Sequence, residues 1–493
     1  MSNKEVTLNT RIAIIGAGPG GLLCARVLQR HGITATVYDT DTSIDARDPG
    51  GTLDLKAESG QIALEDAGLA DEFTALARPE GQAKSTLNHH GTVLATFTPD
   101  EHDTAASEID RGQLRALIAE HVNPNTVRWG HKLEAATPQG GGRHRLEFTN
   151  GTTDEVDLVI GADGAWSRIR QLVSEAVPTY SGISLLDVTF DDVDRHHPDI
   201  AALVGDGHMF ATSGTGQAII GQRNSNGRVH GFIGMRVPLN WADQAGIDTN
   251  DTEAIRQFLQ AEFADWSKDL LPFITESARF ANRPLHALPT PLTWPSTPGV
   301  TLLGDAAHLM SPFGGFGVNL ALLDGAELAR ALAEETTVDT AITRYEATML
   351  PRANELAAGA NDALDRFFSP TALDPATIPN PRAEHDRSVA AAAQYRRTRS
   401  GVDGTWMLRF RTPRGERQLD LTLTTTGSAL AGALDGTVIE DGHIAGADIS
   451  FTTHLTTPFK MKVRCTASID GNTMTGKAKA AMMALPFTAE REA

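Results

Sequence analysis

The sequence predicts an α/β fold in which a parallel-sheet domain carries an inserted β-sheet domain, followed by a long helix and an all-β domain. Three observations support this prediction. A glycine-rich strand–turn–helix unit lies near the N-terminus, and two later strands end in glycine–aspartate turns. Residues 403–493 alternate between apolar and polar side chains with frequent turn signals, which is typical of small antiparallel barrels or sandwiches.

The glycine-rich unit has the form of a nucleotide-binding motif. An apolar strand at 12–15 breaks into the run GAGPGG and continues as an amphipathic helix. Gly16 permits the tight turn, Gly18 allows the backbone to approach a pyrophosphate, and Gly21 lets the helix pack on the strand. The helix N-terminus supplies N–H groups for the phosphates. A second strand ends in Asp39, about where a Rossmann-like domain has its ribose-binding acid.

The composition limits the class of protein. A chain of 493 residues is too long for one hydrophobic core, so several domains are expected. The formal net charge of −19 argues against nucleic-acid and anionic-membrane partners, which are bound by clustered lysine and arginine. The two cysteines, Cys24 and Cys465, have neither disulfide nor metal-ligand spacing, and the N-terminus lacks an apolar signal segment. We therefore expect a cytoplasmic protein without a bound metal.

Arginines near the first motif are candidates for contacts with an anionic cofactor. Arg47 lies in an otherwise acidic loop, and Arg111 and Arg115 share one face of a helix predicted over 108–122. Two interpretations are open for these side chains: cofactor contacts, or solvated surface arginines.

Two later motifs place further carboxylates and glycines at strand ends. A strand over 158–160 leads into a turn that carries Asp163 and Gly164. A strand over 299–303 leads into Asp305, and the loop PFGGFG at 312–317 then opens another helix. Such an arrangement places a carboxylate and several N–H donors around one ligand.

With the three motifs together, the sequence resembles the group A flavoprotein monooxygenases, in particular the tetracycline-inactivating flavin monooxygenases, from about residue 11 to about residue 370. The runs GGTLDL (50–55), RGQLRA (111–116) and GDAAHLM (304–310) carry the closer match. The resemblance implies FAD as cofactor, NADPH or NADH as a transient reductant, and O2. It also implies hydroxylation of a polycyclic aromatic, phenolic or tetracycline-like small molecule through a flavin C4a-hydroperoxide. The flavin carries the chemistry, so no catalytic side chain is assigned.

The resemblance further implies the residues that bind cofactor and substrate. The implied cofactor contacts are Gly16, Gly18, Gly21, Asp39, Arg47, Arg111, Asp163, Asp305, Pro312, Gly315, Gly317, Val318 and Asn319. The implied substrate contacts are Asp187, His208, His230 and Phe313. His208 stands where the tetracycline-inactivating enzymes have an arginine. Because histidine lacks the donor fork of arginine, a phenol or enol is the safer expectation than tetracycline itself.

The expected domain order has five parts. They are a first FAD-binding part (1–180), a substrate-binding sheet domain (181–285), a second FAD-binding part (286–345), a bridging helix with linker (346–400) and a small antiparallel β domain (401–493). The role of the last domain is open, as is the choice between monomer and dimer.

Two alternatives for the activity are also open. One is a related flavoenzyme that does not insert oxygen, of the reductase or halogenase type, although the W-x-W-x-I-P signature of flavin halogenases is absent. The other is a flavin-binding carrier or sensor whose C-terminal domain is the working part.

Overall fold

The computed structural model describes residues 10–46, 50–100, 103–371, 381–399, 402, 404–412, 415–426, 429–445, 448–455, 461–470, 472–480 and 483–491. The chain forms two compact units, Met1–Asp386 and Arg387–Ala493.

A parallel sheet of five strands forms the centre of the first unit, in the order β17-β11-β1-β2-β7. The strands are β1 (Ile12–Ile15), β2 (Thr36–Tyr38), β7 (Val127–Arg128), β11 (Leu158–Gly161) and β17 (Val300–Leu302). Every residue of β1, β11 and β17 is buried, as expected in a parallel sheet covered on both faces. The three sequence motifs follow these three neighbouring strands, so their carboxyl ends meet at one edge of the sheet.

Helices α2 (Pro19–Arg30) and α12 (Gly317–Glu334) pack against each other through small residues. A Cβ on Gly20 would lie 2.6 Å from the carbonyl oxygen of Ala321, and a Cβ on Gly325 would lie 2.6 Å from that of Gly20. Glycine at these positions therefore sets how closely the two helices approach.

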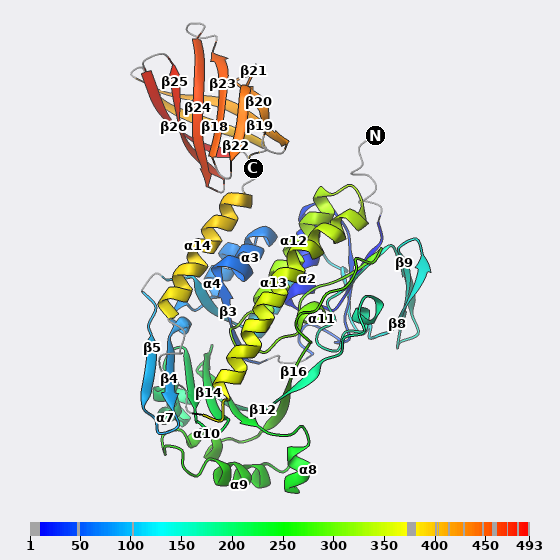
Figure 1. Cartoon of the computed structure of the whole chain (residues 1–493), viewed down its shortest axis with the longest axis vertical. Coiled ribbons are helices and arrows are strands. Elements are labelled where there is room, and N and C mark those ends of the chain that lie inside the picture. The colour runs from blue at the N-terminus through cyan, green and yellow to red at the C-terminus, as the bar shows by residue number, and fades with distance from the viewer. Residues whose placement is uncertain are drawn as a thin grey trace. The chain divides into compact units, whose positions relative to one another are not determined.

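The long predicted helix is α13 (Val338–Phe367), which packs alongside α12 (Figure 1). It is a single helix with Pro351 in its interior, a residue type that commonly kinks or ends a helix. The remaining helices around the parallel sheet are α3 (Ile62–Ala67), α4 (Ala70–Leu76), α5 (Arg111–Glu120), α11 (Asp305–His308) and the short turns η1 (Ala57–Gln61), η2 (Pro79–Gln82) and η3 (Ile169–Leu172). Helix α14 (Pro381–Arg399) includes residues of both units.

The inserted domain is a seven-stranded sheet in the order β16-β12-β15-β14-β13-β4-β5. Its strands are β4 (Lys84–Asn88), β5 (Val93–Phe97), β12 (Thr179–Phe190), β13 (His208–Thr212), β14 (Gln217–Asn224), β15 (Arg228–Arg236) and β16 (Ala281–Ala287). Strands β4 and β5 come from within the range 1–180 that the sequence analysis assigns to the FAD-binding part. Asn226 and Gly227, both with positive φ, form the turn between β14 and β15, as the Asn-Gly signal predicts.

One face of this sheet forms its own hydrophobic core. Met209, Ile219 and Ile233 are fully buried there with Phe263 and Phe273. Helices α7, α9 and α10 lie along this side (Figure 1). The helices of the inserted domain are α6 (Val193–His196), α7 (Pro198–Val204), α8 (Trp241–Ala245), α9 (Thr252–Glu262) and α10 (Pro272–Thr275). The opposite face of the sheet does not belong to this hydrophobic core and includes polar side chains.

Two smaller antiparallel elements complete the first unit. Strands β3 (Thr52–Lys56) and β6 (Ala106–Asp110) pair as a two-stranded ribbon, the β3–β6 ribbon. Strands β8 (Leu133–Gly140), β9 (Arg143–Phe148) and β10 (Thr153–Val156) form a three-stranded sheet.

The second unit is a nearly closed antiparallel barrel. Its strands are β18 (Gly404–Thr412), β19 (Gly415–Thr426), β20 (Ala429–Leu434), β21 (Thr437–Val438), β22 (Glu440–Ala445), β23 (Asp448–Leu455), β24 (Met461–Asp470), β25 (Thr473–Ala480) and β26 (Met483–Arg491). Pairing of β19 with β20 closes the sheet on itself. Trp406, Phe451 and Cys465 belong to a core inside it. Of the two expected forms, barrel and sandwich, the chain adopts the barrel, and the expected fold class is confirmed.

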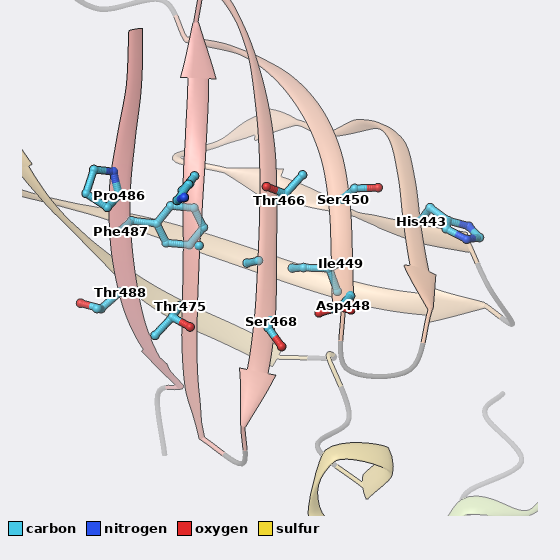
Figure 2. Close-up of a pocket in the computed structure, with 13 residues that line it drawn as sticks. His443, Asp448, Ile449, Ser450, Thr466, Ser468, Thr475, Pro486, Phe487 and Thr488 are labelled. Carbon is cyan, nitrogen blue, oxygen red and sulfur yellow. The ribbon is translucent and has the colours of Figure 1, made fainter. Parts of the chain in front are cut away.

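The barrel carries a hollow of about 690 Å³ on strands β22 to β26 (Figure 2). Asp448, Ser468, Thr475 and Thr488 pair across four strands and form one exposed row along it. The hollow also contacts apolar side chains such as Ile449 and Phe487, and it belongs to the second unit alone.

A buried charge cluster joins α11 to α12 and α13 in the first unit. His308 Nε2 lies 2.6 Å from Asp324 Oδ2, and Arg352 donates to Asp324 Oδ1 at 3.1 Å. Burial by itself lowers the pKa of His308, but the carboxylate of Asp324 raises it to a value above the ordinary one. Burial by itself raises the pKa of Asp324, but His308 and Arg352 hold it below its usual range.

We expect D324N to lower the free energy of unfolding by roughly 3–5 kcal/mol, because it leaves the buried His308 without its carboxylate, whereas Arg352 keeps its pair with Glu327. A raised histidine pKa stabilises the fold fully below the unfolded value of about 6.5 and no longer does so once the pH rises through the folded value. The difference between wild type and D324N should therefore be largest near pH 6 and shrink at higher pH, which denaturant unfolding at several pH values measures.

The control is D265N, which alters the exposed pair of His89 and Asp265, 4.0 Å apart, and should cost less than about 1 kcal/mol. A stability loss in D324N that stays constant with pH would show that His308 contributes no charge.

Candidate functional site

The first motif is shaped by two glycines whose backbones touch other backbone atoms. Gly16 has φ +114°, and a Cβ there would lie 2.2 Å from the carbonyl oxygen of Ala162. A Cβ on Gly21 would lie 2.1 Å from the carbonyl oxygen of Gly16. A Cβ on Gly18, in contrast, would meet no described atom within 4 Å. Two glycines thus permit close packing, and the third borders open space at the start of α2.

The N-terminus of α2 is suited to an anion. Within the described chain, no side chain caps this helix, and its first turn contains no acidic residue. Its free N–H groups and the positive end of its dipole therefore face the space beside Gly18. This arrangement matches what a pyrophosphate requires.

Asp39 lies at the end of β2, next to the glycine motif. Its Oδ2 accepts from the backbone N–H of Ala17 at 2.6 Å, and its Oδ1 accepts from the N–H of Asp41 at 2.7 Å. Arg115 donates to the carbonyl oxygen of Ala17 and to Asp41. Arg115 is thus buried and holds the turn, whereas Arg111 is exposed at the start of α5.

The second motif is a turn organised by a buried carboxylate. Asp163 accepts from the hydroxyl of Ser167 at 2.5 Å and from the N–H of Arg168 at 2.7 Å, while Gly164 has φ +76°. Burial raises the pKa of Asp163 above its usual value, against the lowering effect of these hydrogen bonds. The carboxylate of Asp163 is therefore engaged within its own turn.

Arg170 connects the second motif to the third. This buried side chain donates to the carbonyl oxygen of Ala165 in the second turn and to that of Ala306 in α11. The two strand ends are consequently held together by one guanidinium group.

The third motif brings Asp305 to the start of α12. Asp305 is exposed, and a Cβ on Gly317 would lie 3.9 Å from its Oδ1. Gly315 has φ +67°, and a Cβ there would lie 2.4 Å from Oδ1 of Asp54. The loop 312–317, the glycine loop, therefore lies directly against β3, with Pro312 exposed and Val318 half-buried just after it.

Asn319 attaches this loop to β3. Its side chain donates to the carbonyl oxygens of Asp54 and Gly315 and accepts from the N–H groups of Lys56 and Gly60. Asn319 is fully buried, so its side chain positions the loop and leaves the loop backbone for a ligand.

The face of the seven-stranded sheet opposite its core carries a row of polar side chains. Lys84 pairs with His208, His208 with Gln222, and Gln222 with His230 across β4, β13, β14 and β15. Directly paired residues point to the same side of a sheet, so these four form one row, the polar row.

The polar row faces the β3–β6 ribbon. His208 Nε2 lies 2.8 Å from Glu108 Oε1, and Lys84 Nζ lies 3.9 Å from Asp54 Oδ2. A Cβ on Gly50, just before β3, would lie 3.3 Å from the His230 ring. Asp54 and Glu108 are themselves paired across the ribbon, so two carboxylates face two nitrogen side chains.

Electrostatic pairing at this contact keeps both charge types ionised. Burial by itself raises the pKa of Asp54, but Lys56, 3.1 Å away, and Lys84 lower it below the usual carboxyl range. Burial by itself lowers the pKa of Lys56, but Asp54 raises it above its usual value. Lys56 Nζ also lies 5.3 Å from the ring centroid of Phe316 in the glycine loop.

The other expected substrate residues lie on the same face of the sheet. Asp187 Oδ2 lies 3.6 Å from His230 Nε2 and forms an ion pair with Arg283. Half-buried aromatic rings connect this region to the glycine loop: the ring centroids of Phe210 and Phe367 are 6.2 Å apart, and those of Phe367 and Phe313 are 4.9 Å apart.

The structure therefore assembles most of the expected residues at one edge of the parallel sheet and on one face of the inserted sheet. Arg47 lies outside the described residues. Four polar side chains of the site had no assigned role in the sequence analysis: Asp54, Lys84, Glu108 and Gln222. Asp54 lies in the run GGTLDL, but recognising Glu108 requires the register between β3 and β6.

In the described part of the chain, no helix is long and apolar enough to span a membrane. The same residues include no cluster of three or more His, Cys, Asp or Glu side chains that could hold a metal ion.

Comparisons with known proteins agree with this geometry. Residues 9–360 match the FAD binding domain family. The monooxygenase asqM of Emericella nidulans is 31% identical over 373 residues, covering 65% of this chain and 83% of that protein. The 6-hydroxynicotinate 3-monooxygenase of Pseudomonas fluorescens is 28% identical over 363 residues, covering 70% and 89%. The structure of the tetracycline destructase Tet(55) is similar with a TM-score of 0.59 at 20% identity, covering 78% and 96%.

These matches decide the class of protein. The expectation of an FAD cofactor from the glycine motifs is confirmed, and the similar curated proteins named above are monooxygenases, which gives no support to a flavoenzyme that does not insert oxygen. The chain belongs to the FAD binding domain family, and it is an FAD-dependent, NAD(P)H-consuming monooxygenase.

Proposed function

We propose that the enzyme hydroxylates a hydroxyaromatic or enolic substrate that binds between the polar row and the glycine loop. The observation that carries this proposal is the composition of that region. The half-buried Phe210 and Phe232 lie beside His208 and His230, and the half-buried Phe313 packs against the same apolar cluster as Phe232. Aromatic rings favour a flat apolar ring system, and the histidines provide partners for its hydroxyl groups. Polycyclic phenols, tetracyclines and hydroxypyridine acids are candidates of this class.

The chain has the features that an FAD pyrophosphate needs. Open space at Gly18, the uncapped start of α2 and the close contacts at Gly16 and Gly21 would receive the pyrophosphate, and Asp39 would receive the ribose. Bound FAD, once reduced by NAD(P)H, supplies the oxygen-activating chemistry. The residues around it position the substrate and exclude water. Asp305, Arg111 and the backbone of the glycine loop would complete the cofactor contacts.

The first prediction concerns the reaction. FAD-loaded protein should oxidise NADPH or NADH in air faster when a suitable polycyclic phenol or tetracycline is present, and the product mass should rise by one oxygen atom. The rate of NADPH or NADH oxidation is measured in parallel assays with a panel of such compounds. Mass spectrometry then gives the masses of the products. Products without added oxygen would contradict the proposed reaction, and NAD(P)H oxidation that yields only peroxide with every compound of the panel would contradict the proposed substrate class.

The second prediction concerns the open space at Gly18. G18A should fold normally, because no described protein atom lies within 4 Å of the new methyl group, yet it should weaken FAD binding about tenfold or more by occupying pyrophosphate space. Titration of the apoprotein with FAD, followed by flavin fluorescence, measures the change.

The matched control is G359A in α13, where a new Cβ also meets nothing within 4 Å. It should leave FAD binding unchanged and stabilise the helix by about 0.5–1 kcal/mol. Wild-type FAD affinity in G18A would mean that the pyrophosphate does not lie over this glycine.

A further inference from the structure

The contact of His208 with Glu108 is a buried histidine–carboxylate pair inside the proposed substrate region. Glu108 is fully buried, and His208 is 6% exposed. Their atoms Nε2 and Oε1 lie 2.8 Å apart and join the inserted sheet to the β3–β6 ribbon.

The neighbours of Glu108 indicate which nitrogen of His208 carries the proton. Arg78 donates to the hydroxyl oxygen of Thr52 at 3.0 Å, and the Thr52 hydroxyl donates to Glu108 Oε2 at 2.7 Å. Glu108 accepts this hydrogen bond at Oε2, and an N–H at Nε2 of His208 is the donor that would satisfy Oε1. In a neutral imidazole with its proton on Nε2, the lone pair lies on Nδ1.

Nδ1 of His208 has no hydrogen-bond partner among the described residues, although it is buried. A buried acceptor without a donor is destabilising, so it is a position where a ligand donor is favoured. The ring of His208 also lies parallel to that of Phe210, with centroids 5.9 Å apart. An aromatic surface and an unpartnered base are therefore adjacent.

We propose, on the basis of the proposed function, that His208 is the base that accepts the hydroxyl proton of the substrate and that Glu108 is its positioning residue. The O–H bond of the substrate breaks, its proton binds Nδ1, and the electron pair remains on the substrate oxygen. No electron leaves either partner. The imidazolium is held by Nε2–H donation to Glu108, and the proton returns to the product oxygen or to water. A phenolate or enolate donates electrons to an incoming oxygen more readily than the neutral hydroxyl does.

The charges around His208 favour this transfer. Glu108 and Asp54 face it from the ribbon, and Lys84 faces it from β4. The two carboxylates stabilise an imidazolium, while Lys84 stabilises an anionic substrate oxygen. Each charge that the transfer creates therefore has a counter-charge nearby.

The test begins with the resting FAD-loaded protein. Histidine-ring ¹⁵N NMR should show His208 protonated on Nε2 and unprotonated on Nδ1, with the resonance assigned by its disappearance in H208Q. A proton on Nδ1 would overturn the proposal, and this readout needs no substrate and no turnover.

Kinetics then test the role of the base. H208Q keeps an amide donor for Glu108 but has no base, so turnover of a hydroxyaromatic substrate should fall about 100-fold or more at neutral pH. The loss should shrink as the pH approaches the substrate's own hydroxyl pKa, because the substrate then ionises unaided. E108Q should lower the turnover rate less than H208Q does, and its loss should likewise shrink as the pH rises.

The control is H197Q. His197 also pairs with a glutamate, Glu276, and its ring lies next to Phe190 on the core side of the same sheet. This variant should leave both the rate and its pH dependence unchanged. If H208Q and E108Q lowered the turnover rate equally at every pH, the pair would be a structural contact only, and the proposal would be overturned. If wild type hydroxylates nothing in the panel, the proposed substrate class fails, while the NMR result still decides the state of His208.

Discussion

The packing of the β3–β6 ribbon on the inserted sheet buries carboxylates, and their pairing fixes how the polar row lies against the ribbon. Glu108 is fully buried, and Asp54 is largely buried. An uncompensated buried carboxylate costs several kcal/mol, so each one requires a partner. His208 and Lys84 of the polar row are partners from the inserted sheet, and Lys56 of the ribbon itself lies 3.1 Å from Asp54. These contacts between ribbon and inserted sheet therefore hold the polar row, the proposed substrate face, close to the glycine loop that lies against β3.

A second constraint acts at the edge of the parallel sheet. Strands β1, β11 and β17 are neighbours, so their carboxyl ends bring three separate sequence motifs together. Backbone contacts at Gly16 and Gly21 leave no room for side chains, and Arg170 links the second motif to α11. The edge is consequently rigid where a cofactor phosphate needs fixed donors. The proposed substrate side is built on the inserted sheet, away from the backbone contacts of this edge.

The C-terminal barrel follows a simpler logic. Its strands alternate between buried and exposed side chains, and residues such as Trp406 and Phe451 fill its inside. Period-two alternation with regular turns is visible in sequence, so an antiparallel β domain could be predicted. The choice of barrel over sandwich could not, because it depends on the pairing of β19 with β20, which no local pattern encodes. Pro351 is a comparable case. Proline locally favours a break in a helix, yet α13 continues through Pro351 as one helix that packs on α12.

Local chemistry was enough to predict the class of fold and a nucleotide-binding motif at Gly16, Gly18 and Gly21, because turns, helix starts and strand ends need particular residue types at fixed spacings. The family and the cofactor role of Asp305 came from the resemblance of the three motifs to known flavoproteins. The site as a whole needed long-range register. Glu108 and His208 are a hundred residues apart in sequence, and neither is unusual in its own segment. Their pairing follows from the registers of β3 with β6 and of β4 with β13, together with the requirement that buried charges be neutralised across two domains. Burial and register are properties of the folded chain, so only the three-dimensional arrangement could bring Glu108 into the site and show that it pairs with His208, which the resemblance had already indicated.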